Sequence, residues 1–234
     1  MRQLFSQKKK ASMAAIILGG LFLGFKASVP GKAEDPFLTL CKNSDAYFTH
    51  SYRDITYEKY WGNYRKHISI NNKLVVNNPS GVEKYAFLRL DEFESNTIES
   101  IKIRTLKANG SIVELDSSLV FKRNSKREKF GPINYPIPAV EPGDTIETSY
   151  VYYERIEESN LNGYVNLYSA VPSINSQYTI KTGPQLTVRY KTYNDFPKPA
   201  VIANDTIVYL QFSMDNVIGL EENEYSCLPC EKPY

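Results

Sequence analysis

The segment 145–153, TIETSYVYY, is the feature that most restricts the fold of this chain. Nearly all of its residues are β-branched or aromatic, and such side chains favour a pleated strand over a helix. It follows the sequence EPGD at 141–144, in which proline presets one turn position and glycine accepts the positive φ that a type II turn needs next. Every second residue from Ile146 to Tyr152 is expected on one face. We therefore predict a central strand that starts directly after a tight turn.

Similar strand patterns recur along the chain, with turn signals between them. The hairpin predicted at 98–115 is the clearest, because alternating apolar residues flank Asn109-Gly110, a pair that tolerates positive φ. Further strands are predicted at 66–76, 85–90, 165–171, 177–182, 185–192 and 206–212, with a bulge or tight hairpin at Asn71-Asn72 and a turn at 77–81. The spacing predicts an all-β fold, an antiparallel β-sandwich or open barrel. We favour a β-sandwich of one or two lobes at 45–215, followed by an irregular C-terminal tail at 216–234.

Residues 1–33 have the pattern of an export signal. A basic leader precedes an apolar core at 11–25, which is shorter than the roughly 20 residues that a spanning helix needs. Cleavage after Ala33 would fit the preference for small residues, and an uncleaved N-terminal membrane anchor is the alternative. Cys41 is no lipid-attachment site, because the bulky Leu38-Thr39-Leu40 precedes it. We expect a signal helix and an exported protein that is periplasmic, cell-surface or secreted.

The charge distribution argues against nucleic acid as a partner. The chain has 28 Lys and Arg against 26 Asp and Glu, and six of the basic residues lie in 1–33, where there is no acidic one. The remainder therefore has 22 basic and 26 acidic residues, a net charge of −4. Nucleic-acid binders usually concentrate a basic excess, which this part of the chain lacks.

Cys227 and Cys230 form the one motif that suggests thiol chemistry. The pair could be incidental thiols or a local disulfide, could include a partner in Cys41, or could serve a redox or zinc role. The redox role is disfavoured, because such pairs lie at a helix N-terminus and prolines surround this one. Zinc would need further ligands, for which only Cys41, His50 and His67 are available. We predict no metal and no cofactor.

Tyr60, Trp61 and Tyr64 lie in a ring-rich segment, 45–70, that favours short strands. Together they could form a platform for sugars, although core packing is the stronger interpretation. The basic run at 122–129 is typical of a solvated loop, and docking of an acidic partner or polysaccharide is the alternative. The sequence contains no Gly-x-Ser-x-Gly, P-loop or dinucleotide motif, so we predict a protein that is not an enzyme.

The chain resembles a bacterial family of domains of unknown function that precede transglutaminase-like domains in exported proteins. The resemblance lies in Asn109-Gly110, in Pro138, Val140, EPGD at 141–144, Ile146 and Tyr150, in 170–172, 178–180 and 186–194, and in SMDNVIGLEENEY at 213–225. It implies an antiparallel β-sandwich, normally followed by a Cys/His/Asp domain. The sequence ends at Tyr234, where that domain would begin, so no residue of its triad can be assigned here. The resemblance therefore implies either a stand-alone module or a shortened form of a longer protein.

Three functions follow as hypotheses. The leading one is an exported, non-catalytic β-sandwich module that packs against or presents a partner, either another protein or a transglutaminase-like domain. The second is a glycan- or cell-wall-binding module that uses Tyr60, Trp61 and Tyr64. The third is a thiol-redox role for Cys227 and Cys230.

Overall fold

The computed structural model describes residues 35–91, 94, 97–116, 133–157, 161, 167, 169–183, 186–193, 196–203 and 207–220. The chain divides into two compact units, Met1–Ala33 and Glu34–Tyr234, and all described residues belong to the second. The predicted signal at 1–33 and the two cysteines of the tail lie outside the described residues. None of the described helices is long and apolar enough to span a membrane.

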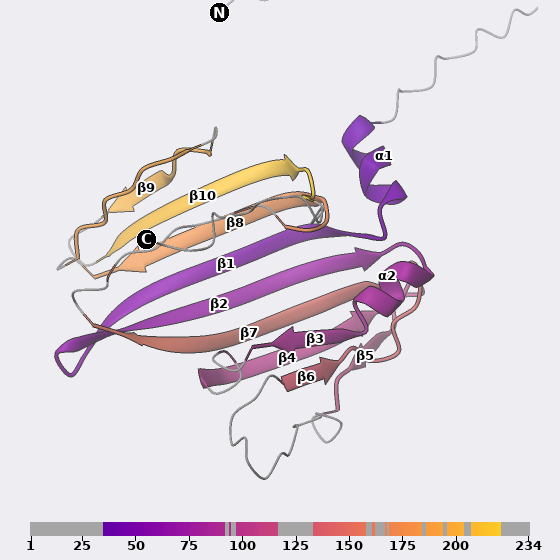
Figure 1. Ribbon diagram of the computed structural model, residues 1–234, viewed down its shortest axis with the longest axis horizontal. Coiled ribbons are helices and arrows are strands. Elements are labelled where there is room, and N and C mark those ends of the chain that lie inside the picture. Colours follow the sequence, from indigo (N-terminus) through magenta and orange to yellow (C-terminus); the bar gives the residue numbers. More distant parts are fainter. Residues whose placement is uncertain are drawn as a thin grey trace, which may run out of the picture. The chain divides into compact units, whose positions relative to one another are not determined.

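Strands dominate the described residues (Figure 1). The elements are α1 (Pro36–Asn43), β1 (Ala46–Tyr60), β2 (Asn63–Val76), α2 (Pro79–Lys84), β3 (Phe87–Leu90), β4 (Ile98–Leu106), β5 (Ile112–Glu114), β6 (Ile133–Pro136), β7 (Thr145–Ile156), β8 (Ser173–Thr182), β9 (Ala200–Ala203) and β10 (Val208–Val217). Eight strands form one sheet in the order β5-β4-β7-β2-β1-β8-β10-β9, and β3 pairs with β6 in a separate sheet. The coarse prediction of a β-rich fold is confirmed, and the described strands form no closed barrel.

The prediction of a purely antiparallel sheet was wrong at one position. Strands β1 and β8 run parallel, with Ile55 opposite Ile180, so the large sheet is mixed. All other described pairings are antiparallel. Alternation of side chains predicts which face a residue occupies, but it carries no information on the direction of the neighbouring strand.

Strand β7 has the interior position that the sequence predicts, between β4 and β2. Gly143 has φ +92° and the Asp144 N–H donates to the Glu141 carbonyl at 3.1 Å, as expected of the predicted turn. The even-numbered side chains from Ile146 to Tyr152 are all buried. Glu147 is also buried, on the other face, where Lys73 and Arg104 contact its carboxylate.

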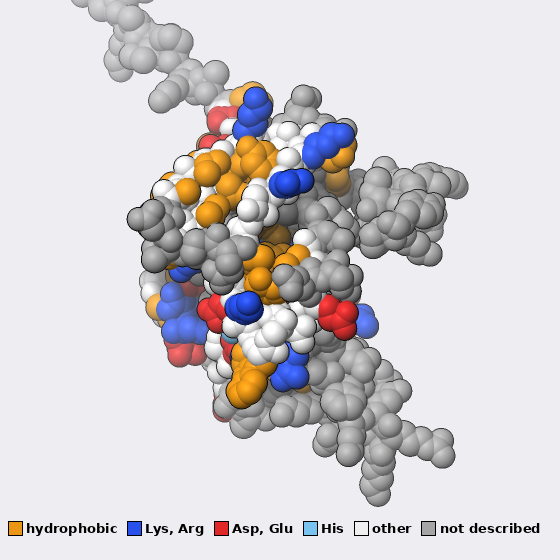
Figure 2. Space-filling model, turned by 90° about the vertical axis from the view of Figure 1, so that its left-hand side faces the viewer, with side chains coloured by type: hydrophobic (Ala, Val, Ile, Leu, Met, Phe, Trp, Pro, Cys, Tyr) orange, Lys and Arg blue, Asp and Glu red, His pale blue; other side chains and the backbone are white. Residues whose placement is uncertain are grey.

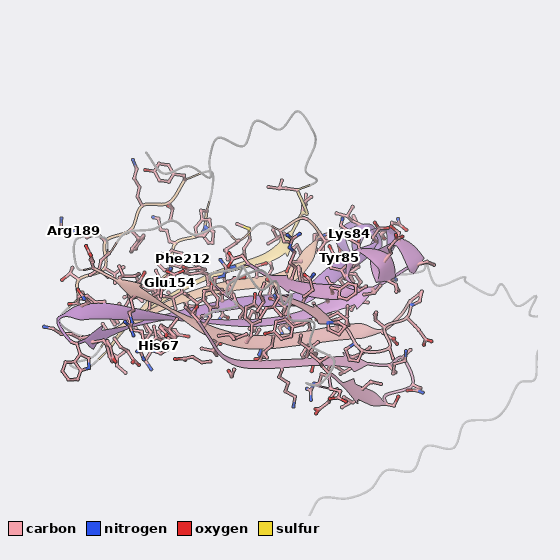
Figure 3. All side chains as sticks on the ribbon, turned by 60° about the horizontal axis from the view of Figure 1, so that its bottom comes forward. His67, Lys84, Tyr85, Glu154, Arg189 and Phe212 are labelled. Carbon is pink, nitrogen blue, oxygen red and sulfur yellow. The ribbon has the colours of Figure 1, made fainter. Side chains whose placement is uncertain are left out.

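Buried side chains from both sheets form one hydrophobic cluster. The large sheet contributes residues such as Ile68 and Ile146, and the region of the small sheet contributes Leu90 and Tyr135. Figure 3 shows the large sheet from its edge, with Phe212 of this cluster on the same side as Glu154. The face that carries Ile68, Tyr152 and Phe212 is therefore the buried face of the large sheet.

Asp144 is held in a buried hydrogen-bond network at the start of β7. Its carboxylate accepts hydrogen bonds from Lys107 Nζ at 2.7 Å, the Glu141 N–H at 2.8 Å and the Ala108 N–H at 3.1 Å. Burial alone raises the pKa of Asp144, but these donors outweigh burial and hold the pKa below its ordinary value of 3.8. The network joins the 141–144 turn to the β4–β5 hairpin.

Several local predictions need correction. The predicted turn at 77–81 is a helix, α2, because the Asn78 side chain accepts from the Gly81 N–H at 2.9 Å and Pro79 occupies the first turn. Strand β2 passes through Asn71-Asn72 without a break, and the register shift lies in β1, between Phe48 and His50. The residues described within 185–192 form no strand, and the predicted strand at 165–171 lies mostly outside the described residues.

Helix α1 was not predicted, although its start signal is present in the sequence. Asp35 caps it by accepting from the Phe37 N–H at 2.9 Å, and Pro36 is its first residue. Cys41 is the buried residue of this helix and is a free thiol. Burial, and secondarily the charge of Asp35, raises the pKa of this thiol, which makes it a poor nucleophile.

Candidate functional site

The three rings proposed as a platform lie at the β1–β2 hairpin, but they do not share one face. Tyr60 ends β1 and pairs with Asn63, whereas Tyr64 pairs with Lys59 one position further along the hairpin. Because consecutive residues point to opposite faces, Tyr64 enters the buried side and is 4% exposed. Tyr60 is 38% exposed and Trp61 is 90% exposed. Only these two rings remain available to a ligand.

Trp61 occupies a backbone position that disfavours a bulky side chain. It forms the turn with Gly62, and the two residues have φ of +48° and +85°. Positive φ at both central positions defines a type I′ turn, in which Asn, Asp or Gly is preferred. The high exposure of the indole means that packing does not compensate the strain. Strain that packing does not explain is concentrated at functional positions.

A substitution can separate this strain from the ring. We expect Trp61→Asn to raise the free energy of unfolding by about 1 kcal/mol, because Asn tolerates the left-handed region that costs other L-residues about 1–2 kcal/mol. Trp61→Ala is the matched control, since it removes the ring but keeps a residue that disfavours positive φ. Urea unfolding of the full chain measures both. Equal stabilities for the two variants would show that the Trp61 backbone is not strained.

Two arginines stack on the tyrosines next to this turn. The Arg65 guanidinium carbon lies 4.2 Å from the centre of the Tyr60 ring and 4.6 Å from that of Tyr153. The guanidinium carbon of Arg155 lies 6.0 Å from the Tyr60 ring. Such contacts attract a cation to the face of an aromatic ring. We call Tyr60, Trp61, Arg65, Tyr153 and Arg155 the hairpin-end surface.

The neighbouring carboxylates contact His67. Its Nδ1 lies 3.2 Å from Glu99 Oε2, and its Nε2 lies 3.5 Å from Glu58 Oε2. His67 lies opposite Tyr153 in the β2–β7 register, with the two ring centres 6.5 Å apart. Figure 3 places His67 on the opposite side of the sheet from Glu154 and Phe212. The hairpin-end surface therefore belongs to the face away from the core.

Figure 2 faces the end of the molecule that includes this hairpin, and it shows hydrophobic and basic side chains next to one another. The Arg65 Nε is buried and has no hydrogen-bond partner among the described residues. Tyr60 and Trp61 meet edge to face, with ring centres 6.4 Å apart and planes inclined by 70°. The surface thus combines exposed rings with guanidinium donors.

The buried face also carries ionisable side chains, three tyrosines and one glutamate. Tyr150, Tyr152 and Tyr178 have raised pKa values, first of all because of burial. Burial also raises the pKa of Glu94, and hydrogen bonds from the Asp91 N–H and the Tyr152 hydroxyl oppose this only in part. These groups are integrated into the core, where Tyr150 and Tyr152 stack with ring centres 6.3 Å apart.

The remaining chemical candidates form no site among the described residues. No group of three or more His, Cys, Asp or Glu in that part of the chain could hold a metal ion. Cys227, Cys230 and the basic run at 122–129 lie outside the described residues. Burial lowers the pKa of His50, with the charge of Lys73 adding to the effect.

Tyr60 and Trp61 were predicted from the sequence as ligand-binding residues, whereas Arg65, Tyr153 and Arg155 were not. Alternation in 63–76 could have placed Arg65 and His67 on one face. Nothing local to the sequence could show that β7 is the neighbour of β2, and this pairing brings Tyr153 and Arg155 to the same surface.

The fold and this surface define a β-rich module built on one large mixed sheet. Residues 63–218 match the model of DUF3857, a domain of unknown function with a solved structure. The chain belongs to this family.

The similarity to solved structures is evidence for a shared fold and not for a shared function. The chain is similar to the crystal structure of a candidate protease from Parabacteroides distasonis ATCC 8503, with 12% identity and a TM-score of 0.62. That likeness covers 77% of this chain and 37% of the other, so this chain spans well under half of that protein. A further likeness, to native leukotriene A4 hydrolase from Saccharomyces cerevisiae, has 11% identity, covers 74% of this chain and 28% of the other, and has a TM-score of 0.36, too low to carry an argument. No curated protein matches the sequence.

Proposed function

We propose that the protein is an exported, non-catalytic module that binds a protein partner through the hairpin-end surface. The observation that carries this proposal is Trp61, an indole exposed at 90% on a residue with positive φ. Trp, Tyr and Arg are the residues that most often dominate binding energy at protein interfaces. All three types meet at this hairpin.

The character of the described thiol supports a non-catalytic role. An activated cysteine needs a lowered pKa and a neighbouring base, whereas Cys41 is buried and its pKa is raised. Export is proposed from the leader pattern at 1–33.

The partner could be a domain of a longer protein. The family fold occurs within the longer Parabacteroides protein, of which it covers 37%. A transglutaminase-like domain, to which the sequence resemblance points, is one such partner in this proposal.

We further propose that the small β3–β6 sheet is the second layer of a sandwich. Leu90 and Tyr135 belong to the same buried cluster as Ile103 and Ile146 of the large sheet. Ile137, which follows β6, also belongs to it and donates its N–H to the Ala86 carbonyl at 2.8 Å.

Site-specific photo-crosslinking tests the binding function. A photoreactive aromatic amino acid, which keeps a ring at this position, replaces Trp61 in the full chain, which is expressed in bacterial cells and irradiated. We expect a discrete protein adduct from position 61, because the partner must contact this residue. The matched control is Ile112, which is 52% exposed on the edge strand β5. No adduct, or the same adducts from both positions, would contradict the proposal.

A glycan- or cell-wall-binding module is the second candidate, favoured by the exposure of Tyr60 and Trp61. Trp61 is the single tryptophan of the chain and reports directly on this surface. A saturable fluorescence change on titration with bacterial polysaccharides would support this candidate over a protein partner. A flat response would remove it.

A further inference from the structure

We infer that the hairpin-end surface recognises an acidic protein segment, with Arg65 as the principal contact for a carboxylate. This inference rests on the proposed binding function and names the chemistry of the partner. Three observations support it: aromatic rings contact the two guanidinium groups, the described carboxylates nearby form no ion pair with them, and the planes of the two exposed rings are steeply inclined.

Arg65 is fixed in place by rings and not by a counterion. The centres of the Tyr60 and Tyr153 rings lie 4.2 Å and 4.6 Å from its guanidinium carbon, and its buried Nε has no hydrogen-bond partner in the part of the chain that the structure describes. A guanidinium that stacks on rings keeps the donors at its edge free for hydrogen bonds. Because Nε is buried, only the terminal Nη donors can reach a carboxylate from outside, which can accept two parallel hydrogen bonds from them. Arg155, stacked on the same Tyr60 ring, adds a second cation.

The described carboxylates near this surface leave both arginines without an ion pair. Glu58 lies directly opposite Arg65 in the β1–β2 register, yet its carboxylate oxygen lies 3.5 Å from His67 Nε2 and forms no ion pair with Arg65. The Glu99 carboxylate is 3.2 Å from His67 Nδ1. Glu157 follows β7, is exposed, and forms no ion pair with either arginine. A carboxylate of a binding partner could therefore form the ion pair that the described carboxylates do not form with these arginines.

The geometry of the rings favours a peptide over a polysaccharide. The Tyr60 and Trp61 planes are inclined by 70°, so these two rings offer no coplanar faces on which successive sugars could stack. In an extended peptide residues i and i+2 share a face, so an apolar side chain can contact Trp61 while an acidic side chain two positions away reaches Arg65. Trp, Tyr and Arg are also the residues enriched at the centre of protein interfaces.

Fluorescence titration of the full chain tests this inference. The probe is a 12-residue peptide of four Glu-Leu-Ser repeats, the control peptide has Gln in place of each Glu, and Trp61 is the reporter. We expect the Glu peptide to bind at least about tenfold more tightly than the Gln peptide, and Arg65→Gln to weaken its binding about tenfold. Lys102→Gln is the matched control, because it removes one positive charge from an exposed side chain of β4 that pairs with Glu114. It should change the Kd less than twofold.

Two outcomes would overturn the inference. Equal affinity for the Glu and Gln peptides would do so, as would equal effects of Arg65→Gln and Lys102→Gln. Polygalacturonate serves as an acidic glycan, and tighter binding of this polymer than of the Glu peptide would also overturn the inference. The proposed function is judged separately by the crosslinks from position 61, so a partner adduct together with equal peptide affinities would remove only the inference.

Discussion

Replacing Asp144 with Asn is expected to lower the free energy of unfolding by about 3 kcal/mol, because an amide cannot accept all the hydrogen bonds of the buried carboxylate and leaves donors unsatisfied. Asp144 is 2% exposed, and its two oxygens accept from Lys107, Glu141 and Ala108. An amide in its place would direct N–H groups at some of these donors. Urea unfolding at neutral pH measures the loss.

Glu141→Gln is the control for Asp144→Asn. Glu141 also contacts Lys107 Nζ, at 2.6 Å, but its side chain is 71% exposed. Exposed ion pairs contribute little, so this variant should lose less than about 1 kcal/mol. Comparable losses for the two variants would show that the burial of Asp144 does not determine its contribution.

The same network predicts how stability depends on acid. The pKa of Asp144 is lower in the folded chain than its ordinary value of 3.8. Its contribution is therefore fully present above pH 3.8 and is lost as the pH falls through the folded pKa. The loss of stability below pH 3.8 should be shallower in Asp144→Asn than in the parent protein. Identical pH profiles would mean that the pKa of Asp144 is not lowered by folding.

Leu90→Ala is expected to have an effect of similar size, a loss of about 3 kcal/mol, because deleting a fully buried leucine removes apolar contacts and leaves a cavity. Leu90 ends β3 and is 0% exposed within the cluster that both sheets share. Phe87→Ala is the control from the same strand, since Phe87 is 54% exposed. Thermal or urea unfolding of the full chain compares them. A loss for Leu90→Ala no greater than for Phe87→Ala would contradict the proposed second layer.

Only part of the candidate site could be predicted from the sequence. The ring-rich pattern identified Tyr60 and Trp61, but grouped them with Tyr64 because the three are close in sequence. The two-residue turn places Tyr60 and Tyr64 on opposite faces, so closeness in sequence was misleading. Asn-Gly is the signal usually sought for such a turn, and Trp61-Gly62 does not resemble it.

The elements that have local causes can be predicted from the sequence alone. Side-chain alternation and β-branching determine β7, and the residues at 141–144 determine the turn before it, because these depend on the φ, ψ and rotamer preferences of a few neighbouring residues. The local pattern does not indicate which strands are neighbours. The parallel pairing of β1 with β8 and the position of β2 beside β7 are known only from the folded structure. Those pairings depend on burying a shared face between residues far apart in the chain. Arg65 meets Tyr153 for that reason alone.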